Sequence, residues 1–282
     1  MKFRPRLFIL VIFLVAGRPF PVLALDKPFD HSVWDQFLKK FVDAEGNVDY
    51  AAVKQDPSIL KKYLKQLAAI EEEDVKATWP REELMALGIN AFNVAVINAV
   101  IQHYPLKSIQ DISGVWEDNA YVSLGEEGWS LNRLRFNFLM DTFRDEKMHA
   151  ALACGAKSCP RLRQEAYTGG KVEGQLFLAA RDFVTNARWN QVEPGSKELK
   201  LSRLFKWYAK DFRLDFGTAE NDRGLSDDEM AILSFVAHYS DDPAKIEDLE
   251  KGNYKIKYLP FDWSLNDVPG RSETHRARNE HD

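Results

Sequence analysis

The chain has 282 residues, of which 45% are hydrophobic and 12% aromatic, and its formal net charge at pH 7 is −5. This composition allows one large domain or two small ones to bury a proper core without relying on disulfides. A net negative charge argues against generic binding to nucleic acids or to anionic membranes.

Residues 1–24 have the three parts of a secretory signal peptide. Lys2, Arg4 and Arg6 precede an apolar run at residues 7–16, and a Val-Leu-Ala cleavage site follows. The run is shorter than the roughly 20 residues of a spanning helix, and an arginine and two prolines after it disfavour an uncleaved anchor. Cleavage removes four basic and no acidic residues, so the net charge becomes −9. We therefore expect an exported protein, periplasmic or secreted, that does not insert into the membrane after cleavage.

Hydrophobic periodicity and capping residues predict a mainly helical chain. The predicted helices cover residues 31–44, 56–70, 81–103, 130–139, 171–188, 202–208, 226–239 and 242–251. Hairpins are predicted at residues 121–129 and around residues 193–196, and a one-sided strand at residues 254–258. The polar end of the chain, residues 269–282, is predicted to be disordered.

The helix predicted at residues 81–103 is apolar around nearly its whole circumference, so we expect it to be buried. The expected fold is α+β: a mainly helical single domain at residues 25–268, with one central buried helix and a small, mainly antiparallel sheet. Asn90 and Asn93 lie within this helix, and a buried amide without partners costs about 1–3 kcal/mol. Both must therefore bind neighbouring backbone, the interpretation we favour, or a ligand.

Both cysteines lie in one stretch of sixteen residues together with His149 and a cluster of positive charge. The stretch begins with residues 148–153, an apolar run of strand length. If it is a strand, His149 and Cys154 face opposite ways, because side chains alternate. In a continuous strand Cys154 and Cys159 would be roughly 16 Å apart, whereas a disulfide needs Cα atoms within about 7 Å. A disulfide therefore requires a turn at the Gly-Ala-Lys-Ser segment between them, whose composition permits it.

Pro160 suits the first position of a helical turn, which would place Cys159 near a helix N-terminus. The free N–H groups there, with the charges of Lys157, Arg161 and Arg163, would favour a thiolate. Cys159 is therefore the candidate for reactivity if it is reduced, and the other cysteine is expected to be inert.

Several motifs that carry chemistry are absent. The sequence contains no phosphate-binding Gly-rich loop, no His-Glu-x-x-His and no Gly-x-Ser-x-Gly. A zinc site would need His103, His149 or His238 to join the two cysteines, which is weak support for a metal. We therefore predict neither a cofactor nor a metal site.

Five segments, in order along most of the mature chain, carry a family resemblance. They are residues 84–93, residues 149–163 (His149-x-Ala151-Leu152-x-Cys154-Gly155-Ala156-x-Ser158-Cys159-Pro160-x-Leu162-Arg163), residues 166–168 (Ala-Tyr-Thr), residues 202–212 (Ser-x-x-Phe-x-Trp-Tyr-x-x-Asp-Phe) and residues 258–266 (Tyr-Leu-Pro-Phe-Asp-Trp-Ser-Leu-Asn). With these motifs the chain resembles domain of unknown function family 547. The resemblance implies no particular activity, although some eukaryotic members are fused to a glutaredoxin-like domain.

The chain departs from this family at two places. Gly88-Ile89-Asn90 stands where relatives typically have Trp-Ile-Asn, and Leu134-Arg135-Phe136 stands where they typically have Ile-Glu-His. If that glutamate and histidine serve chemistry in the family, this chain has lost them.

Three functions remain open from the sequence. The first is an exported binding domain for a small molecule, peptide or protein, in which a Cys154–Cys159 disulfide stiffens the binding loop. Its candidate binding residues are Asn90, Asn93, Lys157, Ser158, Arg161 and Arg163.

The other two functions use a thiol. In a papain- or transglutaminase-like hydrolase or acyl transferase, Cys159 would be the nucleophile and His149 its base, with Asp262 or Asn90 orienting the imidazole. In thiol–disulfide exchange, Cys159 would attack and Cys154 would resolve the mixed disulfide.

Overall fold

The computed structural model describes residues 28–71, 79–192, 195, 198–217, 224–251 and 254–269. The predicted signal peptide and nearly all of the predicted tail therefore lie outside the described residues.

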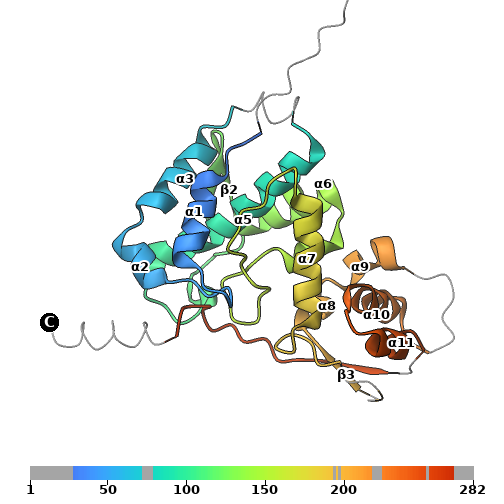
Figure 1. The fold of residues 1–282 in the computed structure, drawn as a ribbon. Coiled ribbons are helices and arrows are strands. Elements are labelled where there is room, and N and C mark those ends of the chain that lie inside the picture. Colours follow the sequence, from blue (N-terminus) through green and yellow to red (C-terminus); the bar gives the residue numbers. More distant parts are fainter. Residues whose placement is uncertain are drawn as a thin grey trace, which may run out of the picture.

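The helices form two groups, each around its own hydrophobic core. In Figure 1, α1, α2 and α3 lie on one side of α5, while α8 to α11 lie together at the other end of the molecule, with α7 between the groups. The helices of the first group are α1 (Ser32–Phe41), α2 (Tyr50–Gln55), α3 (Ser58–Ala68) and α5 (Arg81–His103). Those of the second are α8 (Arg203–Trp207), α9 (Ala209–Phe216), α10 (Asp227–Tyr239) and α11 (Pro243–Lys251).

Helix α5 is the centre of the first core, as its all-round apolar sequence predicted. Every residue from Met85 to Ile97 is buried, and the helix begins directly after Pro80. Its length and hydropathy would also suit a membrane span, but 89% of its most apolar 18-residue window is buried inside the protein. The predicted central buried helix is thus confirmed, with the bounds predicted for it.

Helix α7 (Val172–Thr185) connects the two cores. Val172 and Leu176 belong to the first core, whereas Ala180 and Phe183, one to three turns further on, belong to the second. Short helical elements lie between α5 and α7 along the chain. They are η1 (Ile109–Asp111), the π-helix η2 (Arg133–Met140), α6 (Asp141–Phe143) and the 3-10 helix η3 (Glu146–Ala150).

The strands form two separate pairs. The predicted hairpin at residues 121–129 is present as β1 (Val122–Leu124) and β2 (Glu127–Trp129), which are antiparallel. Strand β3 (Glu198–Leu201) pairs in parallel with β4 (Lys255–Tyr258). In the described part of the second predicted hairpin, Gln191 and Lys200 form an antiparallel bridge, and most of its turn lies outside the described residues. The predicted fold class, a mainly helical α+β protein with a small sheet, is confirmed.

Two local structures that the sequence would permit do not form. Residues 148–153 do not form a strand, since η3 continues to Ala150 and a turn follows. No helix begins at Pro160, whose segment runs without regular structure up to α7. The sequence also gave no sign of α2, whose first turn Asp49 caps by accepting from the Ala52 N–H at 3.0 Å.

Candidate functional site at the Cys154–Cys159 disulfide

The two cysteines are bonded, with their Cα atoms 5.6 Å apart. The predicted turn between them is present and depends on Gly155, whose φ of +77° is strained for any residue with a Cβ. The Cys159 N–H closes the turn on the Ala156 carbonyl at 3.0 Å. Both cysteines are only 3% exposed, so neither sulfur is presented to solvent.

Aromatic side chains cover the disulfide. Trp116, Phe261 and Trp263 pack against it and against Ala156. Trp207 of α8, which is 44% exposed, extends this cluster, with its ring centroid 4.8 Å from that of Phe261 and 5.8 Å from that of Trp263. The disulfide therefore lies beneath an aromatic surface built by residues from three distant parts of the chain.

The C-terminal segment clasps the disulfide loop by its backbone. The Lys157 N–H donates to the Ser264 carbonyl at 2.8 Å, and the Asn266 N–H donates to the Gly155 carbonyl at 3.2 Å. The Ser158 hydroxyl accepts from the Asp262 N–H at 2.8 Å. The Asp262 carboxylate accepts from the Ser264 N–H at 2.9 Å. The Ser264 side chain is the largest cause of the lowered pKa of Asp262, and this backbone bond lowers it further. Among the described contacts, Asp262 and Ser158 therefore shape the loop, while the Lys157 side chain is exposed.

His149 has a partner that sequence reasoning missed. Its Nε2 lies 2.8 Å from the Asp211 carboxylate, and its ring stacks on Tyr208 with centroids 4.2 Å apart. Because a carboxylate only accepts, Nε2 carries the proton, which leaves Nδ1 buried and without a partner in the described part of the chain. Burial is the largest cause of the lowered pKa of His149, which favours the neutral ring. The signal available in the sequence was that Tyr208 and Asp211 both lie in the motif at residues 202–212.

Arg135 lies beside this histidine, at the position where the family resemblance implies a glutamate. Its guanidinium donates to the Tyr208 hydroxyl at 2.6 Å and lies between the rings of Phe92 and Tyr208, 5.1 and 5.2 Å from their centroids. Its positive charge further lowers the pKa of His149. Replacement of an acid by arginine therefore opposes protonation of this imidazole, whereas a glutamate would favour it.

The two buried amides of α5 bind backbone on both sides. Asn90 donates to the Tyr167 carbonyl at 2.8 Å and accepts from the Tyr167 N–H at 3.1 Å. Asn93 donates to the Ala151 carbonyl and accepts from the Ala153 N–H. These contacts fix the segments on either side of the disulfide to the central helix.

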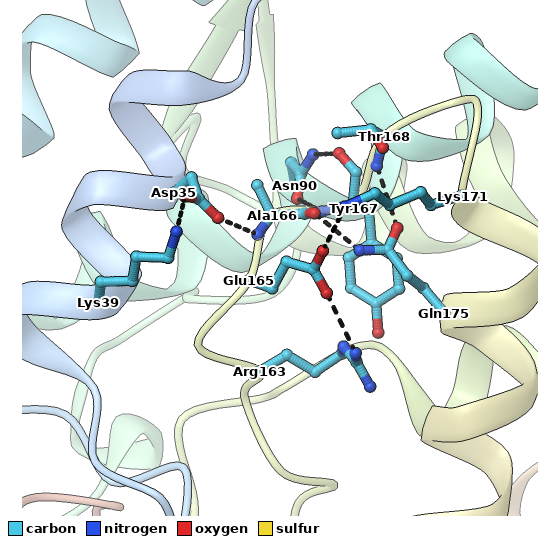
Figure 2. A network of polar contacts seen from close by, with 10 residues as sticks. All are labelled: Asp35, Lys39, Asn90, Arg163, Glu165, Ala166, Tyr167, Thr168, Lys171 and Gln175. Atoms are coloured by element: carbon cyan, nitrogen blue, oxygen red, sulfur yellow. Dashed lines mark hydrogen bonds and ion pairs between the residues drawn. The ribbon is translucent and has the colours of Figure 1, made fainter.

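Arg161 and Arg163 follow the disulfide and differ in their contacts. Arg161 donates to the Ala44 carbonyl at 2.8 Å and pairs with Asp182 at 3.3 Å and Glu45 at 3.7 Å. Among the described residues, Arg163 has one ion pair, with Glu165 at 3.4 Å (Figure 2). Arg163 also lines two clefts, of about 700 Å³ and about 430 Å³. Both arginines therefore line the smaller cleft, where Arg161 has three described partners and Arg163 has one.

The fold and the site define a mainly helical α+β protein with a buried, disulfide-closed loop and no free cysteine. Within the described ranges, no group of three or more His, Cys, Asp and Glu side chains could hold a metal ion. Residues 76–184 match the model of the family described as "Protein of unknown function, DUF547", so this segment is similar to that family. The comparisons with curated proteins and with solved structures found no significant match.

Proposed function

We propose that the protein is an exported binding protein whose binding residues lie between the disulfide and α7, on residues 160–171. The disulfide and its aromatic cover would hold one end of this segment, and Asn90 would hold the other end through Tyr167. The segment between the two anchors lines both clefts. A segment fixed at both ends loses little conformational entropy when it binds a ligand.

The geometry favours binding over thiol chemistry. Cys159 is bonded and buried, so neither a nucleophilic thiolate nor an accessible disulfide for exchange is presented. No helix begins at Pro160 to lower the pKa of a Cys159 thiol, and the His149 Nε2 atom is bonded to Asp211 rather than facing a sulfur. The proposal therefore treats Cys154 and Cys159 as structural residues.

One observation carries the proposal: Arg163 lines two clefts, and among the described residues its guanidinium has one hydrogen-bond partner, Glu165. A guanidinium at the surface of a cleft is a common anchor for carboxylate or phosphate groups. By contrast, the other candidate residues that the sequence suggested are bonded within the protein or lie outside the clefts.

The test has two parts. First, the full chain is expressed and its exported form is treated with iodoacetamide before and after reduction. We expect a mature chain beginning near Leu25, labelled only after reduction. Labelling before reduction, or retention of the chain in the cytoplasm with its leader, would contradict the proposal.

Second, wild type and Arg163→Gln are screened by thermal unfolding against a chemically diverse set of small molecules and short peptides. We expect at least one compound class to raise the unfolding temperature of wild type but not of the variant. A screen in which no class stabilises the wild type would count against a binding function.

A further inference from the structure

The two clefts lie along α7 and share part of their lining. Both are lined by Arg163, Glu165 and Leu178. The larger is bordered by Gly170 and Gly174, where a Cβ would meet no atom within 4 Å, so the wall is bare backbone with open space before it. Volumes of several hundred Å³ are typical of sites for small molecules.

From these clefts we infer that Arg163 and Tyr167 bind the carboxylate of a zwitterionic ligand of the α-amino-acid type with an apolar side chain. The inference deepens the proposed function and rests on it. It draws on the positive, negative and apolar groups of the cleft.

The positive end of the site is Arg163. Of its donors, one Nη pairs with Glu165 at 3.4 Å, and Nε is buried without a partner among the described residues. The other carboxylate oxygen of Glu165 is bonded to Lys171 at 3.0 Å, so Arg163 shares this glutamate with a second cation. A ligand carboxylate could therefore take up the planar fork of Arg163 in bidentate fashion.

Tyr167 supplies a second, independent sign of a missing partner. The residue is 3% exposed, and its hydroxyl has no hydrogen-bond partner in the part of the chain described. Figure 2 shows the hydroxyl pointing toward the Arg163 guanidinium, whose charge acts on it. A buried hydroxyl left unpaired costs about 1–3 kcal/mol. A carboxylate bound at Arg163 would offer this hydroxyl an acceptor once the arginine shifts to admit it.

The same cleft also carries carboxylates in addition to the one that pairs with Arg163 and Lys171. Glu82 and Glu173 line the larger cleft, and neither has an ion pair with any residue described. These carboxylates disfavour a ligand that is only an anion. They suit a ligand that brings an ammonium group together with its carboxylate.

An apolar wall completes the site. Phe177 and Leu178 lie on α7 in the lining of the larger cleft and are 44% and 50% exposed. They are among the few large hydrophobic side chains of the described structure that are this exposed. An aliphatic or aromatic side chain of the ligand would cover them.

The experiment measures calorimetric binding of four compounds to the full-length mature protein: L-leucine, 4-methylpentanoate, 3-methylbutylamine and glycine. L-Leucine has the carboxylate, the ammonium group and the apolar side chain. The other three compounds lack, in the order given, the ammonium group, the carboxylate and the side chain. We expect leucine to bind at least tenfold more tightly than each of the others.

Two variants test the residues. Arg163→Gln is expected to weaken leucine binding at least tenfold, and Tyr167→Phe severalfold. The second removes only an unpaired hydroxyl, so its thermal unfolding should match or exceed that of wild type. The control is Arg181→Gln, because Arg181 lies on α7, also has a single 3.4 Å ion pair, with Asp241, and lines neither cleft. This control should bind leucine as wild type does.

Other outcomes would overturn the inference. If 4-methylpentanoate binds as tightly as leucine, the ligand is an anion, and if 3-methylbutylamine does, it is a cation. If none of the four binds while the broader screen finds another Arg163-dependent class, this inference fails and the proposed function stands. Failure of both experiments would remove both.

Discussion

Two buried ionisable side chains give the protein opposite responses to pH. His31 hydrogen-bonds through Nδ1 to the Tyr63 hydroxyl at 2.7 Å, and burial lowers the pKa of His31 to about 4. Glu146 has a buried carboxylate oxygen without a described partner, and burial raises the pKa of Glu146 to about 7. The fold thus keeps both groups neutral in the range between these values.

For His31 we predict a loss of stability in acid. The unfolded chain binds a proton at its ordinary pKa of 6.5, but the folded chain does so only near 4. The free energy of unfolding contributed by His31 is therefore fully present above pH 6.5 and falls toward pH 4, by on the order of 3 kcal/mol. Urea unfolding of wild type and His31→Gln at several pH values should show that the free energy of unfolding depends less steeply on pH in the variant. The control is His238→Gln, at an exposed position, which should keep the pH dependence of wild type. If His31→Gln also keeps that pH dependence, the prediction is wrong.

Glu146 has the opposite sign. Its folded pKa of about 7 lies above its ordinary 4.5, so its contribution to stability is present below pH 4.5 and is lost as the pH rises through 7. Glu146→Gln cannot ionise, so we predict equal stability to wild type at pH 4.5 and greater stability at pH 8. Asp145→Asn is the contrasting control, because Asp145 pairs with Lys147 at 2.9 Å and caps η3, so it should destabilise. A Glu146→Gln variant less stable than wild type at pH 8 would refute the assignment.

At the scale of the element, what could be predicted depended on how far apart in sequence the partners lie. The start of α10 was predictable because Ser226 and Glu229 cap it three residues apart. The parallel pairing of β3 with β4 was not, because its partners are more than fifty residues apart and their alternation fits a hairpin equally well. The apolar run at residues 148–153 is short enough to suit a strand or a helix, and tertiary contacts decided for η3.

The π-helix η2 packs on α5 at Gly88, where the family resemblance implies a tryptophan. A Cβ on Gly88 would lie 2.6 Å from side-chain atoms of both Phe138 and Leu139. A larger residue would therefore push these two side chains, and η2 with them, away from α5. Gly88 allows the close approach that places Arg135, on the same π-helix, beside Phe92 and Tyr208.

We therefore predict that Gly88→Ala destabilises the protein despite the better helix propensity of alanine. Overpacking costs about 1–3 kcal/mol, against a gain of up to about 1 kcal/mol from propensity. Gly174→Ala on α7 is the matched control, because its Cβ would meet nothing within 4 Å, and it should stabilise. Urea unfolding of both variants measures the difference. Equal gains in stability would mean that α5 and η2 tolerate separation.

At the scale of the whole molecule, the candidate site was predictable only in its covalent part. The requirement for a turn between Cys154 and Cys159 follows from bond geometry and a glycine, both local. The pairing of His149 with Asp211 spans 62 residues and depends on how α9 packs, which spacing alone does not specify. The clefts beside Arg163 likewise exist only because α7 lies against the segment that follows the disulfide.

The C-terminal segment joins the second core to the first, and Asn266 is its main anchor. Its side chain accepts from the Tyr50 hydroxyl at 2.9 Å and donates to the Gly46 carbonyl at 3.1 Å, while its backbone bonds Val48 and Gly155. Asn266→Ala would leave the Tyr50 hydroxyl and the Gly46 carbonyl unpaired, so we predict a loss of about 2–4 kcal/mol. Replacing both cysteines by serine should cost roughly 2 kcal/mol, because the closed loop is short.

The losses of stability in Asn266→Ala and in the cysteine replacement should be coupled, because Asn266 and the disulfide stabilise the same loop at residues 155–158. Once Asn266 or the disulfide is removed, residues 155–158 are less well ordered, so the remaining interaction stabilises the fold less. The combined variant should therefore lose less than the sum of the separate losses, by more than about 0.5 kcal/mol. Asn190→Ala is the matched control: it also removes a buried amide that makes two hydrogen bonds, here to the Phe183 carbonyl and the Ser202 N–H, but in the second core. Its loss should add to that of the cysteine replacement. If the loss in Asn266→Ala also adds to that of the cysteine replacement, the C-terminal segment and the disulfide loop are stabilised independently. The disulfide would then not depend on the segment that covers it.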